Sequence, residues 1–318
     1  MVDGLKPRFA VIAIGGNAII LEGQVGTIQE QFKNCEEFLY PIAVLLSKGW
    51  KIVLTHGNGP QVGAHLIRVE LSQKEIYPLP LDVCVADTQG ELGYMLVNVL
   101  RKLLVGLNTN IPIAAVITQV VVDSEDPRLQ KPSKPVGPFY TKEQIEVHVK
   151  NEGWAVRQDE KGRWRRIVPS PKPKDILEID VIEQLVKDGV FVVACGGGGV
   201  PVVADGQSYK GVEAVIDKDL ASSLLASKLN ADMLIITTGE DQVALHYRQR
   251  NQTFLDHMSL AEAEAHLGEG EFPPGSMGPK IKAGIDFIKQ GGKEVLITTP
   301  EHLLQALEGK TGTRITQD

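Results

Sequence analysis

Two lysines of this sequence stand where helices are predicted to begin. Lys280 follows Pro279, a residue suited to the first helical position, and isoleucines recur behind it at helical spacing. Lys218 follows Asp217, which suits an N-cap, and precedes Asp219 in the first turn. A helix N-terminus carries partial positive charge and unpaired N–H groups, so a cation there is unfavourable unless an anion shares the site. Each lysine alone can simply point into water, but the two together favour a shared anion.

A third lysine, Lys134, lies in the segment KPSKPVGPFY between Pro132 and Pro135. A rigid loop framed by prolines can hold a side chain over a binding site. A surface lysine in a turn explains the same pattern, and composition alone favours that simpler interpretation. The sequence therefore leaves both alternatives open for Lys134.

Three apolar runs end in glycine-rich turns, AIGGNAI at 13–19, LTHGNGPQVG at 54–63 and ACGGGGVPVV at 194–203. At the carboxyl ends of parallel strands, glycine lets backbone N–H groups approach an anion closely. One glycine turn after a strand is weak evidence, because such turns are common. Three of them at one edge of a sheet predict a cradle for phosphate.

Several other site motifs are absent from the sequence. No GxGxxG follows these strands, and EGKTGT at 308–313 lacks the first glycine of a Walker A loop, because Leu304 stands there. His56 has no histidine or carboxylate at metal-ligand spacing, so we interpret it as a turn residue. Neither a dinucleotide fingerprint nor a histidine metal site is indicated.

A predicted α/β fold positions the turns and the lysines. Short Val- and Ile-rich runs are continuous rather than alternating, as in strands buried on both faces of a parallel sheet. These runs lie at 9–14, 51–55, 111–117, 190–195, 233–237 and 294–298. Segments with helical spacing separate most of them. We therefore expect an α/β chain with a mainly parallel central sheet.

The stretch 124–175 interrupts this alternation. It is rich in proline, carries Trp154 and Trp164, and contains a helix candidate at 141–151. We expect a small inserted lobe in which the tryptophans pack as core residues rather than as a ligand platform. The whole chain, 1–318, then forms a single domain from which this lobe protrudes.

Length and composition indicate a protein with a full hydrophobic core. The chain has 318 residues with 43% hydrophobic content, and its net charge of -7 argues against a nucleic-acid or anionic-membrane partner. No window approaches a membrane span, and the N-terminus lacks the features of a signal peptide. Cys35, Cys84 and Cys195 are far apart and form no CxxC pair, which suits reduced thiols in the cytoplasm.

In several blocks of its sequence, the chain resembles the carbamate kinases of the amino-acid-kinase superfamily. The matching blocks, which span nearly the whole length, are AIGGNAI, THGNGPQVG, LPLDVC with TQGELGY, TQVVVD, KPSKPVGPFY, GRWRRIVPSPKP, CGGGGVPVV, KGVEAVIDKDLAS and PPGSMGPK. The resemblance implies a three-layer α/β/α enzyme, homodimeric and cytoplasmic, that interconverts ADP plus carbamoyl phosphate with ATP plus carbamate and uses Mg²⁺. It suggests ATP formation in fermentative arginine or related catabolism.

The resemblance also implies roles for residues that match the family's motifs. Gly15, Gly16 and Asn17 would cradle the transferred phosphoryl group, Gly57, Asn58 and Gly59 would lie beside the carbamoyl group, and Gly196 and Gly197 would bind phosphate. Lys134, Lys218 and Lys280 would neutralise phosphate charge, with Asp219 holding the lysines in place. The nucleotide would lie against Gly239, Asp241, Met277, Gly278 and Lys280.

Two features qualify the nucleotide side of this prediction. Arg248, Gln249 and Arg250 stand where the family often shows a Gly-Lys-Pro-like turn. No carboxylate cage is evident in the sequence, so Mg²⁺ would be held mainly through nucleotide phosphates and water rather than by protein ligands.

Phosphoryl transfer needs mainly positioning and charge stabilisation, which backbone amides, lysines and Mg²⁺ supply. Two alternatives remain at this stage: a kinase of another small carboxylate, phosphonate or amino-acid acceptor, and a non-catalytic nucleotide sensor of the same fold. The complete set of Lys134, Lys218, Asp219 and Lys280 argues against the sensor, because a binder need not keep every charge-stabilising group.

Overall fold

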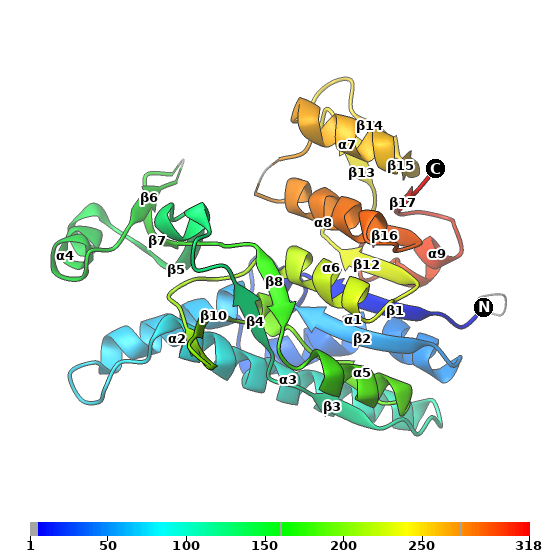
Figure 1. Ribbon diagram of the computed structural model, residues 1–318, viewed down its shortest axis with the longest axis horizontal. Helices are drawn as coiled ribbons and strands as arrows, with labels where there is room; N and C mark the ends of the chain where they lie inside the picture. The colour runs from blue at the N-terminus through cyan, green and yellow to red at the C-terminus, as the bar shows by residue number, and fades with distance from the viewer. Residues whose placement is uncertain (1–5, 160, 274) are drawn as a thin grey trace.

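A large β-sheet forms the centre of the molecule (Figure 1). The computed structural model describes residues 6–159, 161–273 and 275–318, and the side chain of Asn17 lies outside the described part. Within these residues the central sheet has eight strands. In sheet order they are β15 (His257–Ser259), β17 (Thr313–Thr316), β16 (Glu294–Thr298), β12 (Met233–Thr237), β1 (Phe9–Ile14), β2 (Lys51–His56), β9 (Phe191–Val193) and β3 (Ile113–Ala115).

The predicted apolar runs pair in parallel around β1. This strand lies between β12 and β2, with Ile12 opposite Ile235 on one side and Leu54 on the other. The parallel order continues through β16 beyond β12, and through β9 and β3 beyond β2. At one end, β17 runs antiparallel to β16 and pairs in parallel with β15. The prediction of a mainly parallel sheet is confirmed.

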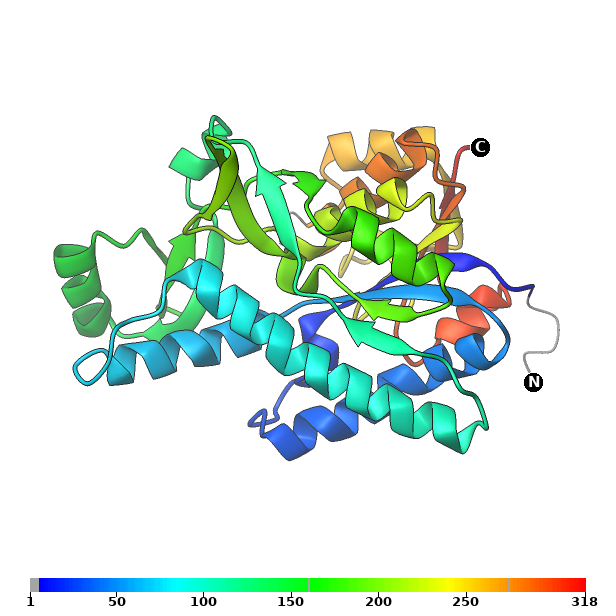
Figure 2. The ribbon, with the colours of Figure 1, turned by 60° about the horizontal axis from the view of Figure 1, so that its bottom comes forward.

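Helices cover both faces of this sheet (Figure 2). The first face carries α1 (Ile28–Ser47), α3 (Leu81–Gly106) and α9 (Leu303–Leu307), and the second carries α5 (Ile179–Lys187), α6 (Lys218–Lys228), α7 (Leu260–Glu269) and α8 (Met277–Lys289). Ala10 and Ile12 of β1 pack against the first layer, and Val11 and Ala13 pack against the second. Successive strand residues point to opposite faces, so a sheet between two helix layers needs apolar residues at every position. The three-layer prediction is thus confirmed.

Smaller sheets extend beyond these layers. One contains β11 (Ser208–Gly211), β10 (Val200–Asp205), β4 (Gln119–Val122) and β8 (Pro173–Ile176), another contains β5 (Lys134–Tyr140), β7 (Trp164–Val168) and β6 (Val156–Gln158), and β13 (Val243–Leu245) pairs with β14 (Thr253–Leu255). The remaining elements are α2 (Gly59–Ser72), α4 (Lys142–Glu152) and the short 3-10 turns η1 (Gly16–Ala18), η2 (Pro127–Gln130) and η3 (Gly196–Gly198). Helix α2 lies along β5 and so links the central sheet to the sheet of β5, β7 and β6.

The sheet of β5, β7 and β6 stands out on the left of Figure 1, together with α4. Trp154 stacks on His148 with ring centroids 4.1 Å apart, and it meets Tyr140 edge-on at 6.0 Å. These three aromatic rings pack on one another inside the stretch 124–175. The division of the chain into one domain and an inserted lobe with these bounds stays a prediction, since β8 at the end of the stretch pairs with β4 outside it.

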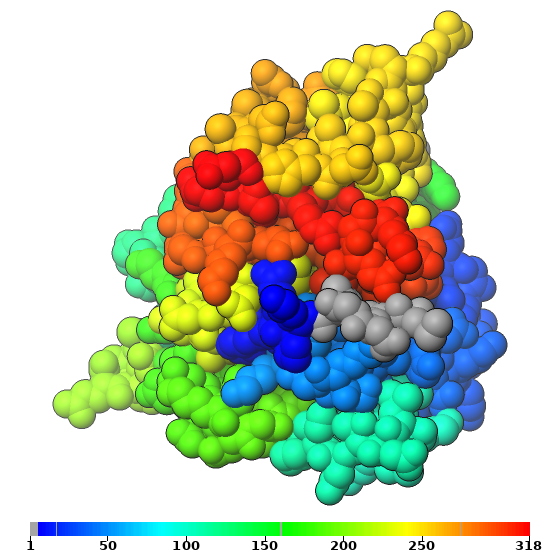
Figure 3. All heavy atoms as spheres, turned by 90° about the vertical axis from the view of Figure 1, so that its right-hand side faces the viewer, coloured from blue at the N-terminus to red at the C-terminus, as the bar shows by residue number. Residues whose placement is uncertain are grey.

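The first described residues lie beside C-terminal segments at the end of the molecule opposite this protruding sheet (Figure 3). Arg8 Nη1 donates to Glu294 Oε2 at 2.6 Å, and the Phe9 backbone N–H donates to Asp232 Oδ2 at 3.1 Å. Cys35, Cys84 and Cys195 are buried and free. Among the described helices, none combines the length and the apolar character needed to cross a membrane.

Candidate active site

The glycine turns predicted from the sequence meet at one edge of the central sheet. β1, β2 and β9 are neighbours there, and each of them ends at this edge in its glycine turn. The Gly57 N–H donates to the Ile14 carbonyl at 2.9 Å. A Cβ atom on Gly57 would lie 2.7 Å from the backbone N of Gly16. The turns after β1 and β2 therefore touch backbone to backbone, which only glycine at position 57 allows.

The turn after β9 packs beside the turn after β2. Gly197 has a φ of 66°, and a Cβ atom there would lie 2.2 Å from Asn58 Nδ2. The same Asn58 amide donates to Thr88 Oγ1 at 2.8 Å, so its orientation is fixed. His56 is buried with Nδ1 3.1 Å from the Gly57 carbonyl oxygen, and burial lowers its pKa to about 4. His56 is therefore neutral near pH 7, and as the last residue of β2 it contacts the first residue of the turn, in line with the turn-stabilising role that the sequence predicts.

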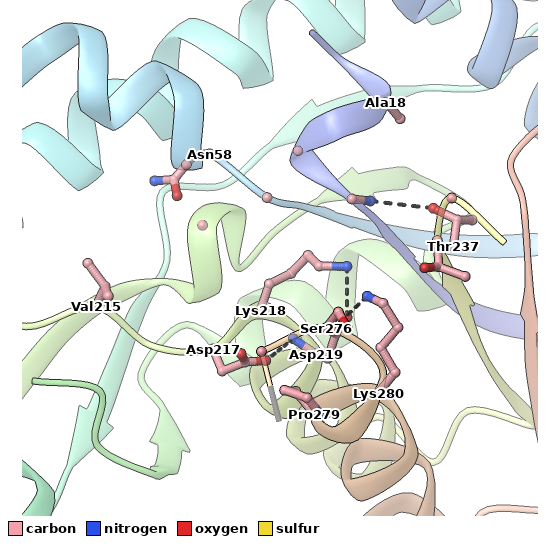
Figure 4. A pocket seen from close by; sticks show the side chains of 18 of the residues that line it. Ala18, Asn58, Val215, Asp217, Lys218, Asp219, Thr237, Ser276, Pro279 and Lys280 are labelled. Carbon is pink, nitrogen blue, oxygen red and sulfur yellow. Dashed lines mark hydrogen bonds and ion pairs between the residues drawn. The ribbon is translucent and has the colours of Figure 1, made fainter. Parts of the chain in front are cut away.

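Two of the predicted lysines converge on one carboxylate. Lys218 Nζ lies 2.7 Å from Asp219 Oδ1, and Lys280 Nζ lies 3.0 Å from Asp219 Oδ2. The lysine side chains are each 12% exposed and that of Asp219 is 7% exposed. Figure 4 shows both lysines pointing toward Asp219, one from α6 and one from α8. Residues 61 positions apart in the sequence thus form one buried cluster with a net charge of about +1.

Burial and charge oppose each other within this cluster. Burial alone would raise the pKa of Asp219, but the charges of Lys218 and Lys280 and their hydrogen bonds lower it to about 2. Burial lowers the pKa of Lys218, while the Asp219 carboxylate raises it and repulsion from Lys280 lowers it. The Asp219 carboxylate, with a smaller contribution from Asp217, therefore favours the charged form of Lys218.

The start of α6 fixes Lys218 against the end of β1. Asp217 is the N-cap, and its Oδ1 accepts from the Asp219 N–H at 3.0 Å, as the sequence predicts. Ser222 Oγ donates to the Lys218 carbonyl at 2.7 Å and lies 2.6 Å from Thr55 Oγ1 of β2. Lys218 Nζ also lies 3.5 Å from the Ala13 carbonyl oxygen. Strands β1 and β2 thereby hold the first turn of α6 in place.

Lys134 reaches the same place from β5. Its Nζ donates to Asp217 Oδ2 at 2.8 Å, and its side chain is 43% exposed. Of the two alternatives that the sequence leaves for Lys134, the structure favours a side chain held over a site, because Lys134 and Asp217 line one cavity with Lys218 and Lys280.

This cavity has a volume of about 540 Å³. The predicted residues that line it are Gly15, Gly16, Gly57, Asn58, Gly59, Lys134, Gly197, Lys218, Asp219, Gly239 and Lys280. A pocket of this size, with glycine backbone on one side and lysines on the other, suits a small polyanion.

Sequence reasoning placed Gly239, just after β12, at the site but missed three other residues at the ends of β12 and β16. Thr237 ends β12, and Thr299 and Glu301 follow β16; all three line the cavity. Thr237 Oγ1 lies 3.4 Å from the Gly15 backbone N and donates to the Ala13 carbonyl at 3.3 Å. Both strands were predicted, and the rule that ligands gather at carboxyl ends of parallel strands applies to them equally. That rule, applied beyond the glycine turns, would have found these residues.

The comparisons with known proteins agree with this geometry. The model of the amino acid kinase family matches residues 8–299. The chain belongs to the amino acid kinase family. It is 45% identical over 312 residues to a carbamate kinase of Pyrococcus horikoshii, covering 98% of this chain and 99% of that one. It is also 45% identical to a carbamate kinase-like protein of Escherichia coli, covering 97% and 98%.

A solved structure gives the same result for the fold. A carbamate kinase from Giardia lamblia bound to AMP-PNP superposes with a TM-score of 0.93 at 38% identity, over 100% of both chains. Within the amino acid kinase family the chain therefore falls with the carbamate kinases, and it is a kinase. The resemblance inferred from the sequence blocks is confirmed.

Some residues predicted for this kinase site do not line the cavity. Gly196, Asp241, Met277 and Gly278 are absent from the described lining, and the side chain of Asn17 lies outside the described part. Asp241 Oδ1 accepts from Thr299 Oγ1 at 2.7 Å, so it contacts a lining residue. Met277 packs against the core beneath α8. Direct contact of these residues with a nucleotide stays a prediction.

Helix α8 begins two residues earlier than the sequence suggested. Its first residue is Met277, so Pro279 occupies the third position rather than the first, and Lys280 remains in the first turn. Proline is tolerated there, because N–H groups in the first turn have no partner within the helix. The Gly278 N–H instead donates to the Pro273 carbonyl at 2.9 Å. That bond closes the turn in front of the helix and accounts for the earlier start.

The contact between the first two glycine turns can be tested in this kinase. Gly57→Ala is expected to lower the free energy of unfolding by about 1–3 kcal/mol, because its Cβ must displace backbone rather than a flexible side chain. Turnover should fall roughly tenfold as the turns move apart. Chemical denaturation and steady-state kinetics measure both effects.

Gly90→Ala is the control for this substitution, because Gly90 is exposed in α3 with no atom within 4 Å of its added Cβ. Equal stability and turnover of the two variants would show that Gly57 tolerates a side chain and that the turns are not in contact.

Proposed function

We propose that this kinase transfers a phosphoryl group between carbamoyl phosphate and ADP, giving carbamate and ATP. In that direction the bond from phosphorus to the carbamoyl oxygen breaks, and a bond forms to a terminal phosphate oxygen of ADP. The observation that carries the proposal is the convergence of Lys218 and Lys280 on Asp219 beside the glycine turns. The carbamate kinase names of similar proteins support the choice of substrate.

The glycine turns and the lysines of the cavity have different roles in this proposal. The backbone N–H groups of Gly15 and Gly16 would bind the transferred phosphoryl group, and Gly57 and Asn58 would lie beside the carbamoyl group. Lys218 and Lys280 would stabilise charge on the equatorial oxygens as the group moves between its two partners. No side chain needs to act as a covalent nucleophile, because positioned substrates and fixed positive charge supply what the transfer requires.

Magnesium completes the proposal. Among the described residues, no group of three or more His, Cys, Asp and Glu side chains is arranged to hold a metal ion. Asp219 is already engaged by two lysines, and Asp217 by a third. Mg²⁺ would therefore be held mainly by nucleotide phosphates and water, with Glu301 as a further carboxylate of the same cavity. When bound, it would neutralise phosphate charge.

The cellular setting follows from the resemblance alone. We propose a cytoplasmic homodimer that forms ATP in fermentative arginine or related catabolism. Light scattering on the purified protein measures the dimer, and a monomer at micromolar concentration would remove that part of the proposal.

The experiment that tests the function is a coupled assay of ATP formation from ADP and carbamoyl phosphate. We expect ATP to form with Mg²⁺ and its formation to stop when EDTA removes the metal. An acceptor screen at fixed ATP separates carbamate from acetate, amino acids and phosphonates. Phosphoryl transfer from ATP to none of these acceptors, together with tight ATP binding, would identify a nucleotide sensor instead.

A further inference from the structure

A second carboxylate, Asp217, contacts the third lysine of this site. Asp217 uses its two oxygens for different tasks: Oδ1 accepts from the Asp219 N–H at 3.0 Å and caps α6, while Oδ2 accepts from Lys134 Nζ at 2.8 Å. One side chain therefore joins the first residue of β5 to the helix that carries Lys218 and Asp219. The cavity thus holds three lysines on two carboxylates.

The backbone around Asp217 brings the base of the protruding sheet to this point. Lys134 is opposite Val168 of β7 in the β5–β7 pairing. The residue after β7, Pro169, accepts from the Val215 N–H at 3.0 Å, two positions before Asp217. The ion pair therefore lies where the segment that leads into α6 meets the protruding sheet.

The three lysines of the cavity differ in how far their side chains are exposed. Lys218 and Lys280 are nearly buried, whereas the Lys134 side chain is 43% exposed and the Asp217 side chain is 14% exposed. An exposed lysine has many rotamers of similar energy, and restricting them before a ligand arrives reduces the entropy lost on binding. A single carboxylate at hydrogen-bond distance within the cavity can supply that restriction.

We infer that Asp217 is a positioning residue for Lys134, holding its ammonium group in the cavity so that it meets the phosphate of the substrate. This inference rests on the proposed function, since it deepens the role of Lys134 in that site. A purely structural role for Asp217 would be limited to capping α6, and the two roles use different oxygens of the same side chain.

The variant Asp217→Asn separates these roles, because asparagine caps helices as well as aspartate does but cannot form an ion pair. We expect the KM for carbamoyl phosphate to rise about tenfold, the scale set by the rotamer freedom of a lysine, while kcat and the KM for ADP change less than about twofold. The thermal unfolding midpoint should stay within a few degrees of the wild type. Asp217→Ser, also a good cap without charge, should behave in the same way.

Asp175→Asn is the matched control. Asp175 Oδ1 pairs with Lys228 Nζ at 2.8 Å at the other end of α6, outside the cavity, and accepts from the Ile176 N–H, a bond that asparagine keeps. Its kinetic constants should equal those of the wild type. In a Lys134→Ala background, Asp217→Asn should add nothing further to the KM for carbamoyl phosphate.

Labelling with an amine-reactive ester, measured by mass spectrometry, tests the ion pair between Lys134 and Asp217 and does not depend on enzymatic activity. Lys134 should react faster in Asp217→Asn than in the wild type, and Lys228 should react faster in Asp175→Asn. If the wild type forms no ATP, the proposed function fails, and the labelling rates still decide whether Asp217 holds Lys134. The inference would be overturned if Asp217→Asn left the KM for carbamoyl phosphate unchanged or lowered it, or if it left the labelling rate of Lys134 unchanged. Additive effects of Lys134→Ala and Asp217→Asn on that KM would also overturn it.

Discussion

Replacing Lys280 with alanine is expected to lower turnover by at least ~10²-fold, the scale of losing one donor that stabilises charge in the transition state. Lys280 lines the cavity and is 12% exposed, so water cannot readily replace its charge. The loss should appear in kcat more than in the KM for ADP, because the charge on the moving phosphoryl group is what the lysine stabilises. Steady-state kinetics of the coupled ATP assay measures both constants.

Lys282→Ala is the matched control for this substitution. Lys282 lies two residues further along α8 and is 47% exposed. Its Nζ lies 2.6 Å from Asp286 Oδ1, and neither residue lines the cavity. Its removal should leave kcat within about twofold of the wild type, since an exposed pair one turn apart contributes little. Near-normal turnover of Lys280→Ala would show that Lys280 takes no part in the transfer and only balances the charge of Asp219.

The parallel core of the fold could be predicted because its signal is local. Each run such as FAVIAI must be apolar at every position when helices cover both faces, and that property is visible in six residues. The capping role of Asp217 was predicted for the same reason, since its partner, the Asp219 N–H, lies two residues away. By contrast, β13, β14 and β15 are three residues long each and, unlike the equally short β3 and β9, do not lie in a longer apolar run.

The site could be predicted only in part, because its contacts join distant segments. The helix-dipole argument indicates that a negative charge should accompany Lys218 and Lys280, but it does not identify the charge. In the structure Asp219 supplies it for both lysines. Nothing in the sequence pattern shows that Lys134 meets Asp217, a residue 83 positions away. That contact depends on how β7 lies against the segment before α6, which is a property of the folded chain.

Asp219→Asn is the second substitution for which we expect a large effect, again at least ~10²-fold in turnover. The variant keeps the shape of the side chain but leaves Lys218 and Lys280 close together without their shared negative charge. Because the carboxylate raises the pKa of Lys218 against burial, its removal should lower that pKa further. The residual activity should then decline at a lower pH than in the wild type as Lys218 loses its proton. A kcat profile between about pH 6 and 10 measures this shift.

Asp219→Asn should also change how the stability of the protein depends on pH, and the direction follows from the lowered pKa of the Asp219 carboxyl. The pKa of Asp219 is about 2 in the folded protein against an ordinary value of 3.8, so ionised Asp219 stabilises the fold above pH ~4. This contribution, about 2 kcal/mol, is lost as the pH falls from about 4 to 2. The stability gap between wild type and Asp219→Asn should therefore be constant near neutral pH and shrink below pH ~4, as denaturant titrations at several pH values would measure.

Asp286→Asn provides the control for both measurements, because Asp286 also lies between two lysines, Lys282 and Lys172, but outside the cavity. Its kcat profile should match that of the wild type, since neither lysine reaches the site. If Asp219→Asn kept the wild-type profile as well, the carboxylate would not support the charge on Lys218. The paired lysines would then hold their protons through the bound phosphates alone, and the cluster would be organised by the ligand rather than by the protein.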